Sequence, residues 1–166
     1  MPSSRKKAVA RRFTRDWVAG YVFFDGSSPD GFLKEGMLEM LAHDGKVLTL
    51  DLRTIKWLCF VRDFNSGETE NPERLLRKTF LGRPRAEGLY LRATLTDGDI
   101  IEGIASNDLS LLTAQGLLLT PPDARSNTQR VWIPATALSG LEVVAVIGGS
   151  AKKKSPRIDD QQESLF

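Results

Sequence analysis

The chain has one cysteine and one histidine among its 166 residues. A single cysteine excludes an internal disulfide. Cys59 lies in the apolar run 57–61 with no histidine near it, which predicts a buried core thiol rather than a nucleophile. His43 stands beside an Asp-Gly pair, where a solvated turn residue is expected. So few soft ligands argue against a zinc site, and no cofactor is expected.

Long apolar runs are also missing. No segment approaches the roughly 18 apolar residues that span a bilayer, and no apolar signal segment follows the basic start. We therefore expect a cytoplasmic protein without a membrane partner. Enzymatic motifs are equally scarce: no serine has a base partner in sequence, and no glycine-rich loop ends in Lys-Ser or Lys-Thr. Asp97, Asp99 and Glu102 cluster around a turn and are expected to be a solvated hairpin, so no enzyme is predicted.

Charge is unevenly distributed. Between residues 16 and 149 there are 13 basic and 18 acidic residues, which gives that segment a net charge of −5. The remaining basic residues lie at the two ends, six of them within residues 1–15. Basic ends can hold a polyanion such as RNA or DNA. The predicted nucleic-acid contacts are the six basic residues of segment 1–15 and two from a polar loop of the second half: Arg5, Lys6, Lys7, Arg11, Arg12, Arg15, Arg125 and Arg130.

The apolar pattern is that of β-strands separated by Gly, Pro, Asn and Asp turns. At Asp97-Gly98 two apolar segments meet in a tight turn, and Gly103 predicts a bend in the second one. Strands are expected at 7–13, 17–24, 36–41, 47–51, 56–62, 89–95, 100–105, 109–112, 116–120, 130–134 and 141–147. Between the two groups, Asn71-Pro72-Glu73 predicts the start of a short helix.

The second group of strands repeats the first at an offset of 83 residues. Gly20 corresponds to Gly103, and Leu50, Ile55 and Leu58 correspond to Ile133, Leu138 and Leu141. A constant offset at both ends predicts a duplicated unit of roughly 60 residues.

The repeated unit resembles the Sm-like small β-barrel, the fold of the bacterial RNA chaperone Hfq. The resemblance rests on Leu95-Thr96-Asp97-Gly98, Gly103, Asp108 and the closing segment 131–138. It implies five short, bent strands. It does not imply the nucleotide pocket of that family, because an Asn shortly after Asp108 and an Arg-Gly pair after Arg130 are absent. Segments 60–64 and 125–131 also resemble an uncharacterised bacterial family of paired small barrels with no established activity.

Two further resemblances imply alternative partners. Arg11 and Arg15, with the loop 25–31, resemble the cyclic-di-GMP motif of PilZ domains, although the loop misses the motif by one residue. The last five residues resemble the peptide by which bacterial DNA polymerases and repair proteins dock on the sliding clamp. In that peptide the anchors correspond to Gln162, Leu165 and Phe166.

The sequence as a whole predicts an all-β protein of two tandem Sm-like small barrels joined by a short helical linker, with disordered basic termini. The predicted parts are a disordered arm (1–6), a first barrel (7–64), a linker (65–88), a second barrel (89–148) and a flexible tail (149–166). Two separate cores or one shared sheet are both compatible with the pattern. The expected function is a non-enzymatic binding or regulatory module. Its partner is a nucleic acid held by the basic arm and linker, or alternatively a protein held by the tail.

Overall fold

The computed structural model describes residues 4–24, 31–64, 80, 82, 84–113, 115–122 and 126–148. The first half contains β1 (Ser4–Arg12), β2 (Trp17–Phe24), β3 (Leu33–Lys34), β4 (Met37–Ala42), β5 (Val47–Asp51), the 3-10 helix η1 (Leu52–Thr54) and β6 (Ile55–Val61). The second half contains β7 (Gly88–Leu95), β8 (Ile100–Ala105), the one-turn helix α2 (Ser110–Thr113), β9 (Gly116–Leu119), β10 (Thr128–Pro134), the 3-10 helix η2 (Ala135–Ala137) and β11 (Leu138–Ile147). The prediction of an all-β protein is confirmed.

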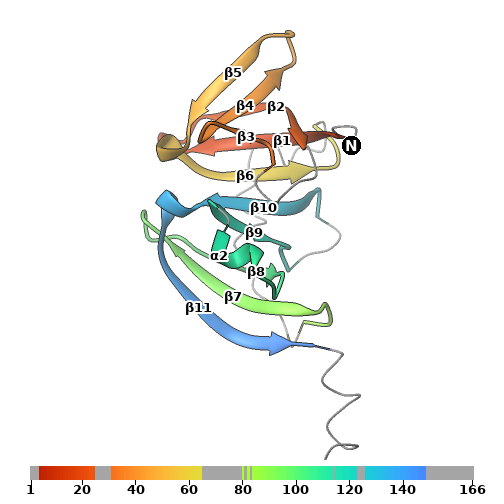
Figure 1. The fold of residues 1–166 in the computed structure, drawn as a ribbon, viewed down its shortest axis with the longest axis vertical. Coiled ribbons are helices and arrows are strands. Elements are labelled where there is room, and N and C mark those ends of the chain that lie inside the picture. The colour runs from red at the N-terminus through yellow and green to blue at the C-terminus, as the bar shows by residue number, and fades with distance from the viewer. Residues whose placement is uncertain are drawn as a thin grey trace, which may run out of the picture.

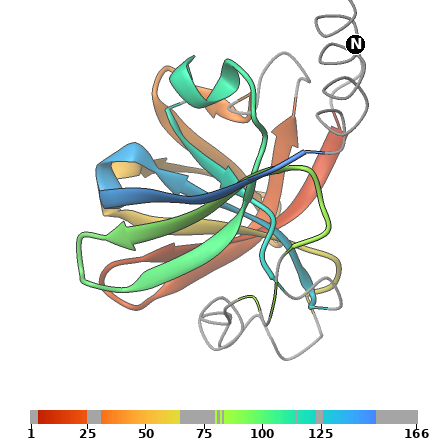
Figure 2. The same cartoon turned by 90° about the horizontal axis from the view of Figure 1, so that it is seen from below.

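The strands form two open sheets in the described residues, not closed barrels. The larger sheet has the order β3-β4-β2-β1-β6-β10-β9, with β5 on the other side of β4, and the smaller one has the order β11-β7-β8. Figure 1 shows β5 at one end of the long axis and β11 at the other. Seen from below in Figure 2, β7 and β11 lie across the strands of the larger sheet.

Apart from the two-residue β3, three of the four strand pairings of the first half recur in the second, where the fourth is reduced to an isolated bridge. In the first half β6 pairs with β1, β1 with β2, β2 with β4 and β4 with β5. In the second half β11 pairs with β7, β7 with β8 and β9 with β10, and a bridge between Ile104 and Thr120 joins β8 to the end of β9. The offset of 83 residues recurs in the starts of β2 and β8, of η1 and η2, and of β6 and β11.

Gly20 and Gly103 occupy matching places in this order. A Cβ at Gly20 would lie 2.5 Å from the Leu41 carbonyl oxygen of β4, and one at Gly103 would lie 2.9 Å from Leu119 of β9. Neither distance is possible for a real side chain, so both glycines let the third strand of their half approach the second closely.

Strand β6 separates two hydrophobic cores. All seven of its residues are buried, which explains the continuous apolar run in the sequence. One face of β6 packs into what we call the N-terminal core: Ala8, Ala10, Val22, Phe32, Leu38, Met40, Leu50, Ile55, Leu58, Phe60 and Trp132. The other face packs into the inter-sheet core: Val9, Trp57, Cys59, Val61, Leu91, Ala93, Leu95, Ile101, Ala105, Leu117, Leu119, Val131, Ile133 and Ala137. Cys59 carries a buried thiol in this core, as predicted.

The N-terminal core is completed by the second half. Strand β10 pairs with β6, and Trp132 of β10 lies fully buried against Phe32, with the ring centroids 5.1 Å apart. The two halves therefore share one sheet and each other's side chains, which decides between the two arrangements that the sequence left open.

Some predicted elements were wrong. Residues 4–6, predicted as part of a disordered arm, belong to β1. The strand predicted at 109–112 is replaced by α2, where the Asp108 carboxylate accepts a hydrogen bond from the Ser110 backbone N–H at 2.9 Å, as a capping residue does. The predicted linker helix lies outside the described residues. No helix in the described part of the chain is both long and apolar enough to cross a membrane.

Candidate functional site

Cationic and aromatic side chains alternate across β1 and β2. The antiparallel register places Arg5 opposite Phe23 and Lys7 opposite Tyr21. Residues directly opposite each other project on the same face of a sheet, so these four side chains share one face. Phe64, just after β6, and His43, in the turn before β5, join them through ring contacts. We call this set the basic–aromatic surface: Arg5, Lys7, Tyr21, Phe23, His43 and Phe64.

Both cations of this surface lie over rings. The Arg5 guanidinium carbon is 5.1 Å from the Tyr21 ring centroid and 5.7 Å from that of Phe23. The Lys7 amine is 5.8 Å from the Phe64 ring centroid and donates a hydrogen bond to the Arg62 carbonyl oxygen at 3.3 Å. These are cation–π distances, and they hold the charges beside the ring faces. Arg5 is exposed, and Phe23 keeps 43% of its surface open to solvent.

The aromatic members also support one another. The rings of His43 and Phe64 are 4.5 Å apart, and those of Tyr21 and Phe64 are 5.5 Å apart in an edge-to-face arrangement. His43 is exposed, as the sequence predicted, but it packs on aromatic rings rather than standing alone in solvent. The sequence places these three side chains far apart, so no local pattern could have predicted the cluster.

The other basic residues of the N-terminal segment do not join this surface. Lys6 alternates with Arg5 and Lys7 and so projects from the opposite face of β1. Arg11 is buried, and Arg12 forms an ion pair with Asp16 at 2.8 Å. Arg15 lies in the exposed turn with a φ of 75°. Of the six basic residues of this segment that were predicted as nucleic-acid contacts, the structure thus brings together Arg5 and Lys7.

The burial of Arg11 also bears on the PilZ-like resemblance. That motif needs two arginine forks on one accessible surface, but Arg11 is only 9% exposed while Arg15 stands in the turn. Nearly all of the matching loop (25–30) lies outside the described residues.

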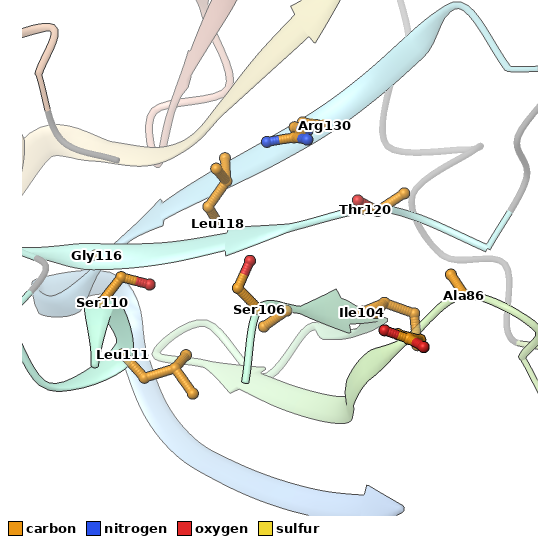
Figure 3. Close-up of a pocket in the computed structure, with 11 residues that line it drawn as sticks. Ala86, Ile104, Ser106, Ser110, Leu111, Gly116, Leu118, Thr120 and Arg130 are labelled. Atoms are coloured by element: carbon orange, nitrogen blue, oxygen red, sulfur yellow. The ribbon is translucent and has the colours of Figure 1, made fainter. Parts of the chain in front are cut away.

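Arg130 contributes to a different feature. It lines a pocket of about 210 Å³ in the second half, together with Ser106, Ser110 and Thr120. Figure 3 shows this pocket where β8 and β9 diverge, beyond their single bridge. Arg130 pairs with Phe60, which pairs with Ala8, so Arg130 projects from the face opposite to Lys7. Of the other predicted contacts, Arg125 and the tail residues Gln162, Leu165 and Phe166 lie outside the described residues.

Sequence reasoning missed an ion cluster that joins the halves. Lys56 of β6 is buried, and its amine lies 2.6 Å from an Asp97 oxygen and 2.5 Å from an Asp99 oxygen of the β7–β8 turn. Burial disfavours the charged amine, but the hydrogen bonds to both carboxylates outweigh it and raise the pKa of Lys56. A lysine inside the apolar run of β6 was the signal in the sequence that something must pair with it.

Glu102 was also misread as solvated. It is 3% exposed and accepts hydrogen bonds from the Tyr90 hydroxyl at 2.7 Å, from the Arg92 guanidinium at 2.9 Å and from the Phe80 backbone N–H at 3.3 Å. Burial alone would raise the pKa of Glu102, but these donors outweigh it and lower the pKa. These three hydrogen bonds tie the Glu102 carboxylate of β8 to β7 and to the backbone at Phe80, so its role is structural.

One family model matches residues 4–145, and it is described as a family of unknown function, DUF6982. The chain belongs to this family. No curated protein and no solved structure matches the chain. For this DUF6982 protein, any function must therefore be argued from its own side chains.

Within the described residues of the DUF6982 chain, no group of three or more His, Cys, Asp or Glu side chains is placed to hold a metal ion. Asp97 and Asp99 share the amine of Lys56 as their ion-pair partner, and Glu102 is paired with Arg92. The basic–aromatic surface, in contrast, presents the charge of Arg5 and the exposed ring of Phe23 together to solvent.

Proposed function

We propose that this DUF6982 protein is a non-enzymatic module that binds single-stranded nucleic acid on its basic–aromatic surface. The observation that carries the proposal is the cross-strand pairing of Arg5 with Phe23 and of Lys7 with Tyr21. Single strands are bound without sequence preference by cations that track the phosphates and by aromatic rings on which bases stack. Both components occur here on one face of two neighbouring strands.

The contacts of the two cations favour this proposal. Within the described residues Arg5 lies over aromatic rings, and Lys7 contacts a ring and a backbone carbonyl. Neither contact neutralises the charge, so both side chains keep it for a phosphate. Arg12, in contrast, already has Asp16 as its partner. Strand spacing separates Arg5 from Lys7 by about 6.8 Å along β1, which gives an extended backbone two charges in sequence.

The fold that presents this surface is, we propose, a duplicated Sm-like unit with its two copies fused through β6 and β10. Three observations support this: the recurring strand pairings, the recurring offset of 83 residues, and the matching roles of Gly20 and Gly103. The proposed binding surface lies on β1 and β2. It is therefore not the nucleotide pocket of the Sm family, whose residues the sequence lacks. An experimental structure in which 4–61 and 88–147 fail to superpose strand for strand would refute the duplication.

The binding experiment is a salt titration with a labelled single-stranded oligonucleotide, read by fluorescence anisotropy. Removing both cations (Arg5→Ala with Lys7→Ala) should flatten the slope of log affinity against log salt by about 1.4, since each phosphate contact contributes about 0.7 for a single strand. Phe23→Ala should instead weaken binding by about 1–3 kcal/mol and leave the slope unchanged, because stacking is uncharged.

A matched control removes two exposed basic residues elsewhere, Lys34→Ala with Arg85→Ala. It changes the net charge by the same amount, so an equal loss of slope in the control would show that only overall charge matters and would reject the site. The protein truncated to residues 1–148 serves as a second control. If binding depends on the removed tail, the competing proposal of a protein-interaction module acting through the tail gains support.

A further inference from the structure

Strand β11 is an edge strand with an unusual surface. It is ten residues long, and among the described strands it pairs with β7 alone. Leu141, Val143 and Val146 are each more than half exposed, and Val144 is 39% exposed. A long apolar edge offers a row of unpaired backbone donors and acceptors as well as apolar side chains, and natural proteins rarely leave such an edge uncovered.

The first half shows what covers the corresponding strand. At the offset of 83 residues, Leu141 corresponds to Leu58 and Val143 to Phe60 of β6. Leu58 and Phe60 are 0% and 7% exposed: both pack into the N-terminal core, and β10 lies alongside β6 with Trp132 opposite Leu58 and Arg130 opposite Phe60. The last strand of the first half, β6, is thus covered by β10, the last but one strand of the second half.

The last but one strand of the first half is uncovered. This is β5, which pairs only with β4 among the described strands, and whose Val47 is 59% exposed. Figure 1 shows β5 and β11 at opposite ends of the long axis, so one chain cannot bring its own two edges together. A second copy can supply the edge that the first one lacks.

We propose that copies of this chain associate head to tail, with β11 of one copy pairing antiparallel with β5 of the next. The proposal rests on the duplicated unit argued above and repeats the β6–β10 pairing between molecules. The same register sets Leu141 opposite Thr49 and Val143 opposite Val47 of the neighbouring copy. It also brings Glu142 diagonal to Lys46, an attractive pair within side-chain reach.

A head-to-tail contact has a consequence that a twofold contact lacks. It uses two different surfaces on each copy, so it continues until it closes into a ring or extends as a filament. Each copy then covers both of its exposed edges, whereas a twofold pairing of β11 with β11 would leave β5 open in every copy.

Solution mass from light scattering after gel filtration tests the proposal. The wild-type chain should run at an integer multiple, two or more, of 18.4 kDa. Val143→Lys blocks the β11 edge and Val47→Lys blocks the β5 edge, so each variant alone should be a monomer. An equimolar mixture of the two retains one intact pair of edges and should give a species of twice the chain mass and nothing larger. Ile100→Lys, at a residue 51% exposed on β8, is the matched control and should assemble like the wild type.

Several results would overturn the proposal. A monomeric wild type would show that no copy occupies the edge, and an assembled Val47→Lys variant would show that β11 pairs with itself. A mixture that stays monomeric would exclude the complementary edges. An assembly lost on truncation to residues 1–148 would identify the tail as the segment that occupies the β11 edge.

Val146→Lys replaces Val143→Lys if the latter loses the circular dichroism spectrum of the folded protein. These variants leave the basic–aromatic surface intact, so failure of assembly and failure of oligonucleotide binding are separate results.

Discussion

Replacing Trp132 with alanine tests how the two halves depend on each other. The indole comes from β10 in the second half but lies fully buried in the N-terminal core, against Phe32. An aromatic side chain of this kind buries roughly 200 Å². At about 25 cal/mol per Å², its removal costs about 5 kcal/mol, at the upper end of the 3–5 kcal/mol that Trp-to-Ala changes typically cost.

A loss of about 5 kcal/mol should lower the melting temperature by about 10–20 °C for a chain of this length. The substitution should also destabilise both cores at once. Trp132 lies on β10, which pairs with β6, and β6 contributes side chains to each core. Urea unfolding in a Trp17→Phe background leaves Trp57 as the one tryptophan of the variant. Its fluorescence then reports on the inter-sheet core, while far-UV circular dichroism reports on all the strands.

The expected result is one unfolding transition with the same midpoint urea concentration by both probes. The free energy of unfolding should be lower than that of the background by the full loss estimated for the indole. Trp17 is 41% exposed, so its replacement alone should change the free energy of unfolding by less than about 0.5 kcal/mol. A loss below about 1 kcal/mol for Trp132→Ala would refute the argument from burial. Separate transitions for Trp57 fluorescence and circular dichroism would refute the claim that β6 couples the two cores.

Three other substitutions test the described contacts. Gly103→Ala should destabilise the protein by about 1–3 kcal/mol in urea unfolding, because its Cβ would stand 2.9 Å from β9, whereas Gly148→Ala, with nothing within 4 Å, should have no effect. Lys56→Met should cost about 1–3 kcal/mol at neutral pH, because it leaves the carboxylates of Asp97 and Asp99 without this donor. Because the folded pKa of Lys56 is raised above its ordinary 10.5, thermal melts should show this difference persisting below pH 10.5 and disappearing as the pH rises through the folded value. Glu102→Gln should cost about 1–3 kcal/mol at neutral pH. The pKa of Glu102 in the folded protein is lowered below its ordinary 4.5. Thermal melts should therefore show that the stability difference between wild type and variant is lost as the pH drops below 4.5 through the folded pKa. A difference that stays constant with pH would contradict the hydrogen-bonded carboxylate.

Local features of this fold were accessible from the sequence. Alternating apolar residues marked most strands, and the Asp97-Gly98 pair marked a hairpin turn, in which Gly98 adopts a φ of +92°. Gly20 and Gly103 were recognised as a matched pair, although their reason is the close approach of a third strand rather than a bend alone. The strand and hairpin-turn predictions were possible because hairpins depend on neighbours in sequence.

Contacts between distant segments were not accessible. Phe64 and His43 reach the basic–aromatic surface through tertiary packing, and nothing near them in sequence indicates it. Lys6 and Lys7 look alike in a basic run, but they separate onto opposite faces once β1 is known to begin at Ser4. Glu102 was misread because a carboxylate near a turn is usually solvated, and its donors, Tyr90 and Arg92, lie across the strand pair.

The placement of Trp132 in the N-terminal core also sets an order of events during synthesis. A chain emerging from the ribosome displays β1 to β6 long before β10 exists, and until residue 132 arrives Phe32 has no indole to pack on. The first 61 residues are then a sheet with one apolar edge open, the kind of transient species that misassembles or recruits a chaperone. The first half of this protein is therefore made first but completed only after β10 of the second half has been made.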